Sequence, residues 1–242
     1  MEAIKIEGLT KKYKDLTAVD NLTLSVENGE LISLLGINGA GKTTTVKMLS
    51  CLTEPTSGDA YLNGKSIKAE ASLVKSIIAV SPQETAIAGA LNVRENLELM
   101  CGAHGFSKEK TKLKVEEMLD GFSLRSVEKK KASKLSGGWQ RRLSIAMALI
   151  SEPQILFLDE PTLGLDVIAR SDLWDTIKSL KGRVTMILTT HYMEEAESLS
   201  DRVAIMRDGR LLIYDTAEKI KQKAGVDSFE SAFVRIVKGE VE

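Results

Sequence analysis

The spacing of hydrophobic and polar positions changes along the chain, and each spacing predicts a different kind of element. Near the N-terminus, "AIKIEGLTKKY" and "AVDNLTLSVENGELISLLG" are rich in β-favouring residues, and "ENGE" is a turn signal between strands. The later stretch "SGDAYLNGKSI" contains Asn-Gly, which favours a tight hairpin turn. From about Val93 to Ile150, apolar residues recur at helical spacing among many charges. The pattern therefore predicts a β-rich front followed by a helical insert.

Three apolar runs in the second half of the chain predict buried strands. They are "QILFLDEP", "VTMILTTH" and "RVAIMRDGRLLIY", and the helical segment "ARSDLWDTIKSL" separates the first two. Strands that alternate with helices indicate a parallel sheet with crossover connections. The sequence contains no internal repeat and no low-complexity linker. We therefore expect one α/β unit over residues 1–242, with a short tail over residues 217–242.

Composition and charge narrow the classes of function. The 33 basic and 34 acidic residues give a net charge of −1, which argues against a general nucleic-acid surface. Cys51 and Cys101 lack metal-ligand spacing, so we expect small core residues in a reducing compartment. The N-terminus lacks the regions of a signal peptide, and no apolar stretch approaches the roughly 20 residues that cross a bilayer. Work at a membrane would therefore require another subunit.

One stretch interrupts its apolar surroundings with glycines and a cation. In "LLGINGAGKTTTV", Gly36 is followed after four residues by Gly41, Lys42 and Thr43, which is the spacing of a phosphate-binding P-loop. Backbone N–H groups of such a loop converge on phosphate oxygens at the positive end of a helix. Lys42 would reach the β- and γ-phosphates of a nucleotide, and the Thr43 hydroxyl would hold Mg²⁺. The alternative is a Gly-rich turn that caps an ordinary helix. The predicted nucleotide-binding residues of the loop are Gly36, Asn38, Gly39, Ala40, Gly41, Lys42, Thr43 and Thr44.

Two adjacent carboxylates end one of the predicted strands. Asp159 and Glu160 come directly before a proline in "ILFLDEP", and ligands of parallel α/β sheets bind at strand ends. Beside a P-loop nucleotide, Asp159 fits a role at Mg²⁺, either as a ligand or one layer behind it. Glu160 is then the candidate general base for the water that attacks the γ-phosphate. Without a P-loop, the same pair could be two solvent-facing residues at the exit of a strand.

A second glycine-containing stretch, "KLSGGWQRRLSIAMALI", predicts an amphipathic helix with Ser136 as its N-cap. Gly137 and Gly138 are poor helix formers directly after that cap, so they need another explanation. Their exposed amides and the Ser136 hydroxyl would form an anion site at a helix N-terminus. The chain would then carry two phosphate-binding segments for one nucleotide.

Six motifs in fixed order together resemble the nucleotide-binding domain of an ATP-binding cassette (ABC) ATPase: "GINGAGKTT", "SPQE", "LSGGWQ", "ILFLDEP", "LGLD" and "TTH". The resemblance covers nearly the whole chain. It implies a P-loop NTPase (RecA-like) core, an N-terminal antiparallel β subdomain and a helical subdomain at about residues 84–150. It also implies an ATPase that uses ATP and Mg²⁺. In this family two cassettes pack head to tail, so that the signature segment of one contacts the ATP held by the P-loop of the other.

The resemblance also assigns roles to single residues. Tyr13 would stack on adenine, Gln83 would contact Mg²⁺ and the attacking water, Asp166 would lie across the dimer seam, and His191 would contact the γ-phosphate. Plainer interpretations stay open: a half-buried strand aromatic, a loop residue, a helix cap and the first residue before a helix, respectively. The predicted catalytic residues are Glu160, His191 and Gln83, the predicted metal ligands are Thr43, Gln83 and Asp159, and the predicted signature residues are Ser136, Gly137 and Gly138.

Two positions depart from the pattern of the family. Ile37 stands where many cassettes have proline, and Trp139 stands where the signature usually has glutamine. Neither residue removes a backbone amide or the Ser136 hydroxyl, so we expect ATP binding to persist.

A single cassette without a membrane span implies partners. The resemblance implies a second cassette, identical or a sibling, and a separate transmembrane permease that holds the chain at the cytoplasmic face of the cell membrane. The tail, with Phe229, Phe233 and Val237 at helical spacing, is similar to exporter-type cassettes of the ABC-2 group, as is "HYMEEAE". A plain amphipathic helix would show the same spacing. A soluble cassette protein acting on ribosomes or DNA is the alternative, but such proteins resemble tandem cassettes or cassettes split by coiled coils. A P-loop kinase would leave the signature segment unexplained.

Overall fold

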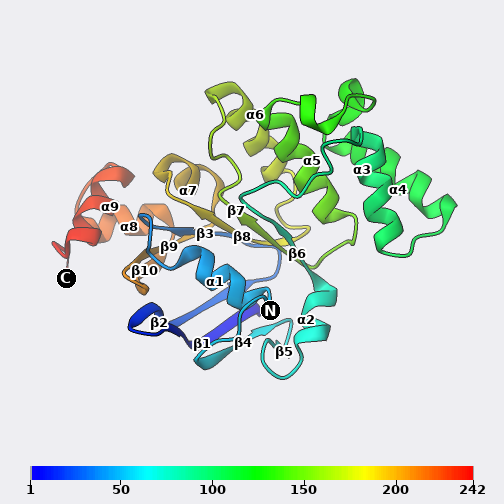
Figure 1. Ribbon diagram of the computed structural model, residues 1–242. Helices are drawn as coiled ribbons and strands as arrows, with labels where there is room; N and C mark the ends of the chain where they lie inside the picture. The colour runs from blue at the N-terminus through cyan, green and yellow to red at the C-terminus, as the bar shows by residue number, and fades with distance from the viewer. Residues whose placement is uncertain (1, 242) are drawn as a thin grey trace.

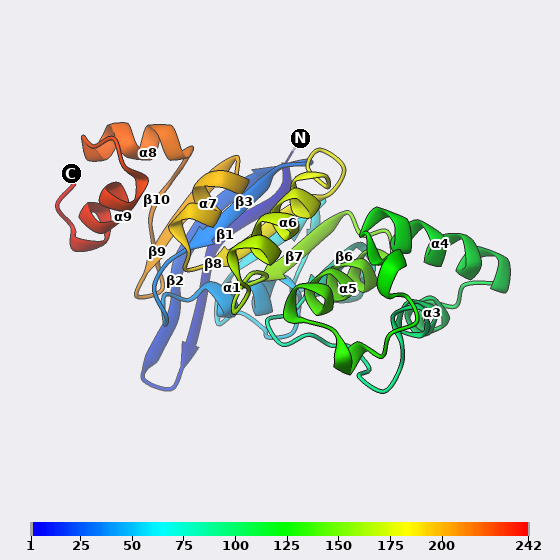
Figure 2. The ribbon, with the colours of Figure 1, turned by 90° about the horizontal axis from the view of Figure 1, so that it is seen from above.

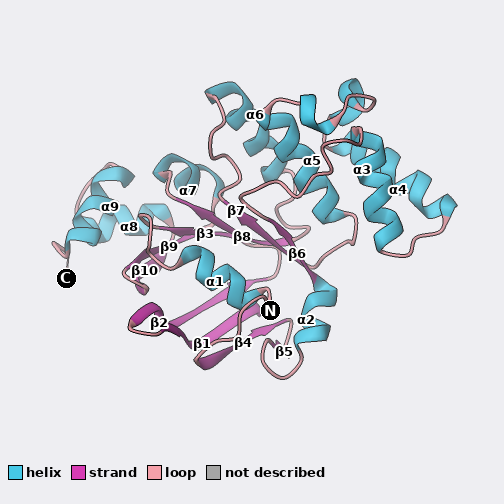
Figure 3. Ribbon diagram, viewed as in Figure 1, coloured by secondary structure: helices cyan, strands magenta, loops and turns pink. Residues whose placement is uncertain are grey.

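The computed structural model describes residues 2–241, which form two β-sheets with helices between and around them (Figure 1, Figure 3). The strands are β1 (Glu2–Tyr13), β2 (Leu16–Glu27), β3 (Leu31–Leu35), β4 (Ser57–Leu62), β5 (Lys65–Ser66), β6 (Ile78–Ser81), β7 (Ile155–Asp159), β8 (Thr185–Thr190), β9 (Arg202–Arg207) and β10 (Arg210–Asp215). The α-helices are α1 (Lys42–Leu49), α2 (Ala71–Ile77), α3 (Val93–Ala103), α4 (Lys108–Gly121), α5 (Gly137–Leu149), α6 (Val167–Lys178), α7 (Met193–Leu199), α8 (Ala217–Ala224) and α9 (Phe229–Lys238). Two 3₁₀ turns, Leu124–Val127 and Ala132–Lys134, precede α5.

The two sheets differ in strand direction. The smaller sheet is antiparallel, in the order β2-β1-β4-β5, and the larger sheet has the order β10-β9-β3-β8-β7-β6. In the larger sheet, β9, β3, β8, β7 and β6 run parallel, and only the edge strand β10 is antiparallel to its neighbour. This arrangement confirms the predicted α/β class with an antiparallel β part in front.

The larger sheet is buried on both faces, as the apolar runs of its strands require. In β7, Ile155 and Phe157 pack in a cluster with residues of α1 and the smaller sheet. Leu156 and Leu158, which alternate with them, pack in another cluster with residues of α5 and α6. Side chains of a strand point alternately to opposite faces, so one apolar run supplies both cores. Helix α1 lies between the two sheets (Figure 1).

The helical insert extends to one side of the large sheet (Figure 2). Helix α3 begins at Val93, because Asn92 and Glu95 form a capping box before it. Leu97 of α3 and Val115 of α4 belong to the same buried cluster as Leu156 and Leu158 of β7. The insert is therefore joined to the sheet by a continuous apolar core.

Two parts of the sequence prediction need correction. The run "RVAIMRDGRLLIY" is a hairpin of β9 and β10 and not one strand, since Asp208 and Gly209 turn the chain with φ values of 50° and 79°. Asp-Gly is a strong hairpin signal for this reason. The second correction is the short strand β6, which the sequence pattern does not predict. It pairs in parallel with β7 at the edge of the large sheet and positions the loop that contains Gln83.

The tail packs against the sheet. Phe229, Phe233 and Ile236 of α9 are buried with Val203 and Ile205 of β9. This packing explains the helical spacing of apolar residues in the tail. Within residues 2–241, every helix is too short or too polar to cross a bilayer.

Candidate functional site

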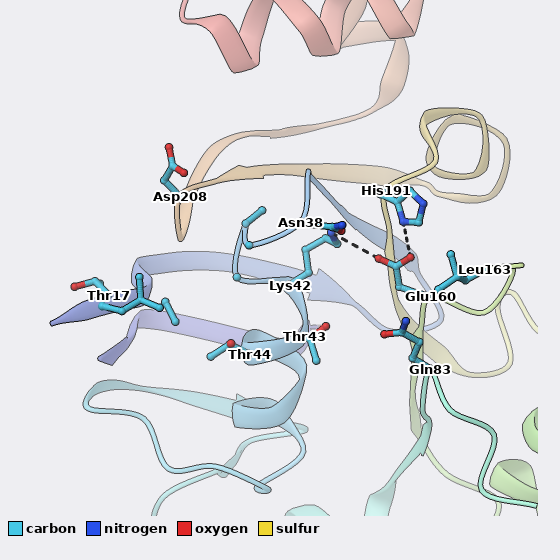
Figure 4. A pocket seen from close by; sticks show the side chains of 15 residues that line it. Thr17, Asn38, Lys42, Thr43, Thr44, Gln83, Glu160, Leu163, His191 and Asp208 are labelled. Atoms are coloured by element: carbon cyan, nitrogen blue, oxygen red, sulfur yellow. Dashed lines mark hydrogen bonds and ion pairs between the residues drawn. The ribbon is translucent and has the colours of Figure 1, made fainter. Parts of the chain in front are cut away.

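The loop between β3 and α1 borders a cavity of about 580 Å³ (Figure 4). Gly41 stands before α1 with φ 99°, a conformation that only glycine adopts without strain. A Cβ atom on Gly36 would lie 2.4 Å from the carbonyl oxygen of Met206, and one on Gly41 would lie 2.5 Å from that of Ala18. The glycines are therefore required by the shape of the loop. The first turn of α1 contains no acidic side chain, so the positive end of its dipole favours an anion.

Lys42 is the buried cation of this cavity. Its Nζ donates to the carbonyl oxygen of Gly36 at 2.7 Å and lies 3.7 Å from Oε1 of Glu160. Burial lowers the pKa of Lys42, while the negative charges of Glu160 and Asp159 oppose that shift. The ammonium group thus has loop carbonyls and one carboxylate as partners. Phosphate oxygens are stronger partners for a lysine than neutral carbonyls.

Asp159, the last residue of β7, brings oxygen ligands together at the start of α1. The Thr43 hydroxyl donates to Oδ1 of Asp159 at 3.3 Å, and the Thr189 hydroxyl donates to the same oxygen at 2.5 Å. Carboxylate and hydroxyl oxygens, completed by water and phosphate, are the ligands that Mg²⁺ prefers. Among the residues that the structure describes, no cluster of three or more His, Cys, Asp or Glu side chains could hold a metal by itself. The oxygen donors of Thr43 and Asp159 fit Mg²⁺ beside a phosphate group.

Glu160 is held at the centre of the site. Its backbone adopts φ 49°, and its N–H donates to both O and Oγ1 of Thr189 at 3.1 Å each. The side chain is 10% exposed, and Oε2 lies 2.5 Å from Nδ1 of His191. Left-handed backbone at a residue other than glycine is uncommon and clusters at functional sites. Figure 4 shows Glu160 between Lys42 and His191.

Gln83 lines the same cavity from the loop after β6, below Glu160 in Figure 4. The carbonyl oxygens of Pro82 and Gln83 both accept hydrogen bonds from Arg141 of α5. Arg141 is buried, which lowers its pKa against the opposing effect of the carboxylates Asp159 and Glu160. This arginine belongs to no motif, so its role is visible only in the structure. It ties the Gln83 loop to the helix that follows Ser136.

The hairpin turn between β9 and β10 also borders the site. The Gly209 N–H donates to the carbonyl oxygen of Ala40 at 3.2 Å, and the Asp20 N–H donates to that of Gly209 at 2.9 Å. The hairpin thereby joins the P-loop to the smaller sheet. Five cavity-lining residues were not predicted from the sequence: Leu16, Thr17, Ala18, Leu163 and Asp208. The Asp-Gly signal could have located the turn, but not its contact with a loop far away in the chain.

Seven predicted site residues lie outside the cavity lining: Tyr13, Gly36, Ser136, Gly137, Gly138, Asp159 and Asp166. Ser136 precedes α5 and is exposed, and within residues 2–241 its side chain accepts no cap hydrogen bond. Asp166 caps α6, since its side chain accepts from the Ala169 N–H at 2.9 Å. Tyr13, at the end of β1, is 45% exposed. Gly138 is buried against α6, and a Cβ atom on it would lie only 3.0 Å from the Cβ atom of Ala169.

A glycine loop at a helix N-terminus, a buried lysine and strand-end carboxylates define a P-loop nucleotide triphosphatase. The family model described as ABC transporter matches residues 19–163. The chain belongs to this family as an ATP-binding subunit with ATPase activity, which confirms the predicted architecture and class of enzyme.

Relatives and solved structures agree with this assignment. The chain is 40% identical over 229 residues to the daunorubicin resistance ATP-binding protein DrrA3 of Streptomyces coeruleorubidus, covering 94% of this chain and 72% of that protein. It is 40% identical over 230 residues to the doxorubicin resistance ATP-binding protein DrrA of Mycobacterium tuberculosis, covering 94% and 69%. An ATP-binding subunit of an ABC transporter superimposes with a TM-score of 0.84 at 27% identity, covering 97% of this chain and 99% of that chain. A dimeric ATP-binding cassette in a post-hydrolysis state bound to ADP and Pi superimposes with a TM-score of 0.77 at 28% identity, covering 88% and 98%.

Proposed function

We propose that two copies of this cassette, or this cassette and a sibling, close head to tail around ATP and drive export through a separate transmembrane permease. The observation that carries the proposal is the position of Ser136. It is exposed and lies outside the cavity that the P-loop borders, although a helix N-terminus favours an anion. A second chain that presents Ser136 to this cavity would complete the site. The dimeric state of a structural relative supports this arrangement.

The residues predicted from the motifs each have a proposed task. Lys42 binds the β- and γ-phosphates, and the P-loop amides surround them. Thr43, Asp159 and Gln83 hold Mg²⁺, which when bound would neutralise charge on the phosphate oxygens. Tyr13 and Asp166 keep their proposed roles at adenine and at the dimer seam, outside the part of the site that one chain builds.

Glu160 is the proposed general base. A phosphate on Lys42 would replace the contact between Nζ and Oε1 of Glu160, which spans 3.7 Å. Glu160 would then be free to accept a proton from the attacking water. His191, 2.5 Å away on the other carboxylate oxygen, would keep the carboxylate oriented and contact the γ-phosphate.

The direction of transport is proposed from the relatives, whose names refer to resistance to daunorubicin and doxorubicin. We infer an export system, with the chain bound to the inner face of the membrane through its permease. Co-purification from detergent extracts should recover a multi-span membrane protein with the chain. Recovery of ribosomes or DNA in its place would contradict a permease-coupled role.

The variant Glu160→Gln tests the proposal that Glu160 is the general base. It keeps shape and hydrogen bonding but removes the base, so hydrolysis should fall on the order of 10²- to 10⁴-fold while ATP binding survives. The closed dimer should accumulate with Mg²⁺-ATP, because its ligand is no longer consumed. Size-exclusion chromatography with crosslinking between the Ser136 and P-loop faces measures the dimer. Glu194→Gln, an exposed carboxylate of α7, is the control. Hydrolysis at the wild-type rate would show that Glu160 is not the base.

A further inference from the structure

Glu195 is a fully buried acid that none of the roles above uses. It lies in α7, four residues after His191 in "HYMEEAE", and its exposure is 0%. The indole Nε1 of Trp174 in α6 donates to its Oε1 at 3.2 Å. In the described part of the chain, neither Oε2 of Glu195 nor Oγ1 of Thr162 completes a hydrogen bond, although both atoms are buried. Buried polar atoms without hydrogen-bond partners lower the stability of the fold. Packing alone therefore does not explain why an acid occupies this position.

The carboxyl group lies where segments from different parts of the site converge. Burial raises the pKa of Glu195, the nearby hydroxyl groups of Thr190 and Thr162 and the indole of Trp174 oppose that shift, and the charge of Glu160 adds to it. Thr190 directly precedes His191, and Thr162 lies two residues after Glu160. One carboxyl group therefore faces both the segment of the base and the segment of its histidine partner.

The Thr162 segment continues toward the predicted dimer seam. The Leu165 N–H donates to the carbonyl oxygen of Thr162 at 3.1 Å, and Asp166 follows directly. Leu163 lines the nucleotide cavity. A shift of this segment would therefore move a cavity wall and the start of α6 together.

We propose that Glu195 is a positioning residue for ATP hydrolysis, whose carboxyl group ties the Thr162 segment to the Thr190 segment and so fixes Glu160 against His191. In the arrangement that hydrolyses ATP, the Thr162 hydroxyl donates to Oε2 of Glu195, which satisfies both unpaired atoms. The inference rests on the roles proposed above for Glu160 and His191. Glu195 itself is fully buried and does not line the nucleotide cavity.

The test compares Glu195→Ala, Glu195→Gln and the control Glu194→Ala, whose side chain is 72% exposed on the same helix. Glu195→Ala should lower kcat for ATP about 10- to 100-fold, the usual cost of a small misplacement of a reacting group. KM should stay within about 2-fold, because the phosphate contacts of Lys42 are intact. Glu195→Gln should recover most of kcat, since its amide oxygen still accepts from Trp174 and its amide NH2 group can donate to the Thr162 hydroxyl oxygen. The Glu194→Ala variant should match the wild type.

Combining Glu195→Ala with Glu160→Gln distinguishes a positioning role of Glu195 from a role in fold stability. In Glu160→Gln, single-turnover hydrolysis should fall no further when Glu195→Ala is added, because the group that Glu195 positions is already gone. A further fall of similar size, or parallel losses of ATP affinity and folding, would overturn the proposal in favour of a structural role.

If Glu195→Ala does not fold, the variant Thr162→Val provides the test. A loss of kcat at constant KM supports the proposal, and wild-type kcat overturns it. An inactive Glu160→Gln with a fully active Glu195→Ala refutes this inference alone, whereas a fully active Glu160→Gln refutes the base assignment and the inference with it.

Discussion

At the scale of single residues, both the P-loop motif and the surroundings of Lys42 indicate that it binds phosphate. The ammonium group is buried and held by the carbonyl oxygen of Gly36 and by Glu160. Lys42→Ala removes a charge-assisted contact with phosphate, so Mg²⁺-ATP should bind about 10- to 100-fold more weakly. Isothermal titration calorimetry measures the affinity. Lys47→Ala is the matched control, because Lys47 is exposed on the same helix. Equal affinities for wild type and Lys42→Ala would contradict the assignment of the P-loop.

The residues of this site differ in how far the sequence reveals them. Lys42, Asp159 and Glu160 lie in short segments with characteristic spacing. The structure places Lys42 and Glu160 in one cavity and Asp159 against Thr43 of its lining. Arg141 and Glu195 act only through contacts with distant segments. No local pattern distinguishes a buried arginine or glutamate of a helix from a solvated one. Long-range burial therefore limits what sequence alone can assign.

At the scale of elements, the junction of α5 and α6 gives Gly138 a packing role beside its place in the signature. A Cβ on Gly138 would lie 3.0 Å from that of Ala169, so Gly138→Val should push the helices apart and destabilise the fold by about 1–3 kcal/mol. Urea unfolding measures the loss. Adding Ala169→Gly should recover part of it by making room.

The matched control for this prediction is Gly121→Ala in α4, where a Cβ would meet no atom within 4 Å. Its free energy of unfolding should be unchanged or slightly higher, because alanine favours helix. If Gly138→Val unfolds at the urea concentration of the wild type, the two helices do not depend on close approach at this glycine.

Elements with a regular period were predictable, and those defined by a partner strand were not. The buried runs around Phe157 and Ile187 form central strands as their apolar spacing predicts. The sequence around Asp208 predicts one strand where the structure has a hairpin, because both halves have the same β-favouring composition. Strand β6 is short, with four residues, and gains its stability from pairing with β7. Such pairing is a property of the sheet and not of the segment.

At the scale of the whole molecule, the proposed dimer would divide each site between two chains. The P-loop cavity contains Lys42, Thr43 and Glu160, whereas Ser136 and Gly137 are exposed outside it. Head-to-tail pairing of two chains would bring each half to its complement. Head-to-tail pairing would also bring Asp166 and the start of α6 near the interface between the two chains. Val167 and Ile168 at the start of α6 are each 75% exposed.

A mixing experiment tests this division directly. Ser136→Arg should leave ATP binding by its own chain nearly intact but abolish hydrolysis, because the bulky side chain would block the nucleotide of the partner. Lys42→Ala should also be inactive alone, for lack of phosphate binding. In a mixed dimer, however, the intact P-loop of Ser136→Arg faces the intact Ser136 of the Lys42→Ala chain. Mixing the two inactive variants should therefore restore part of the ATPase rate. If Ser136 acted on the nucleotide of its own chain, no combination of the two would contain a complete site, and the mixture would stay inactive. Calorimetry on Ser136→Arg alone supplies the control, since loss of ATP binding there would also place the serine in its own pocket.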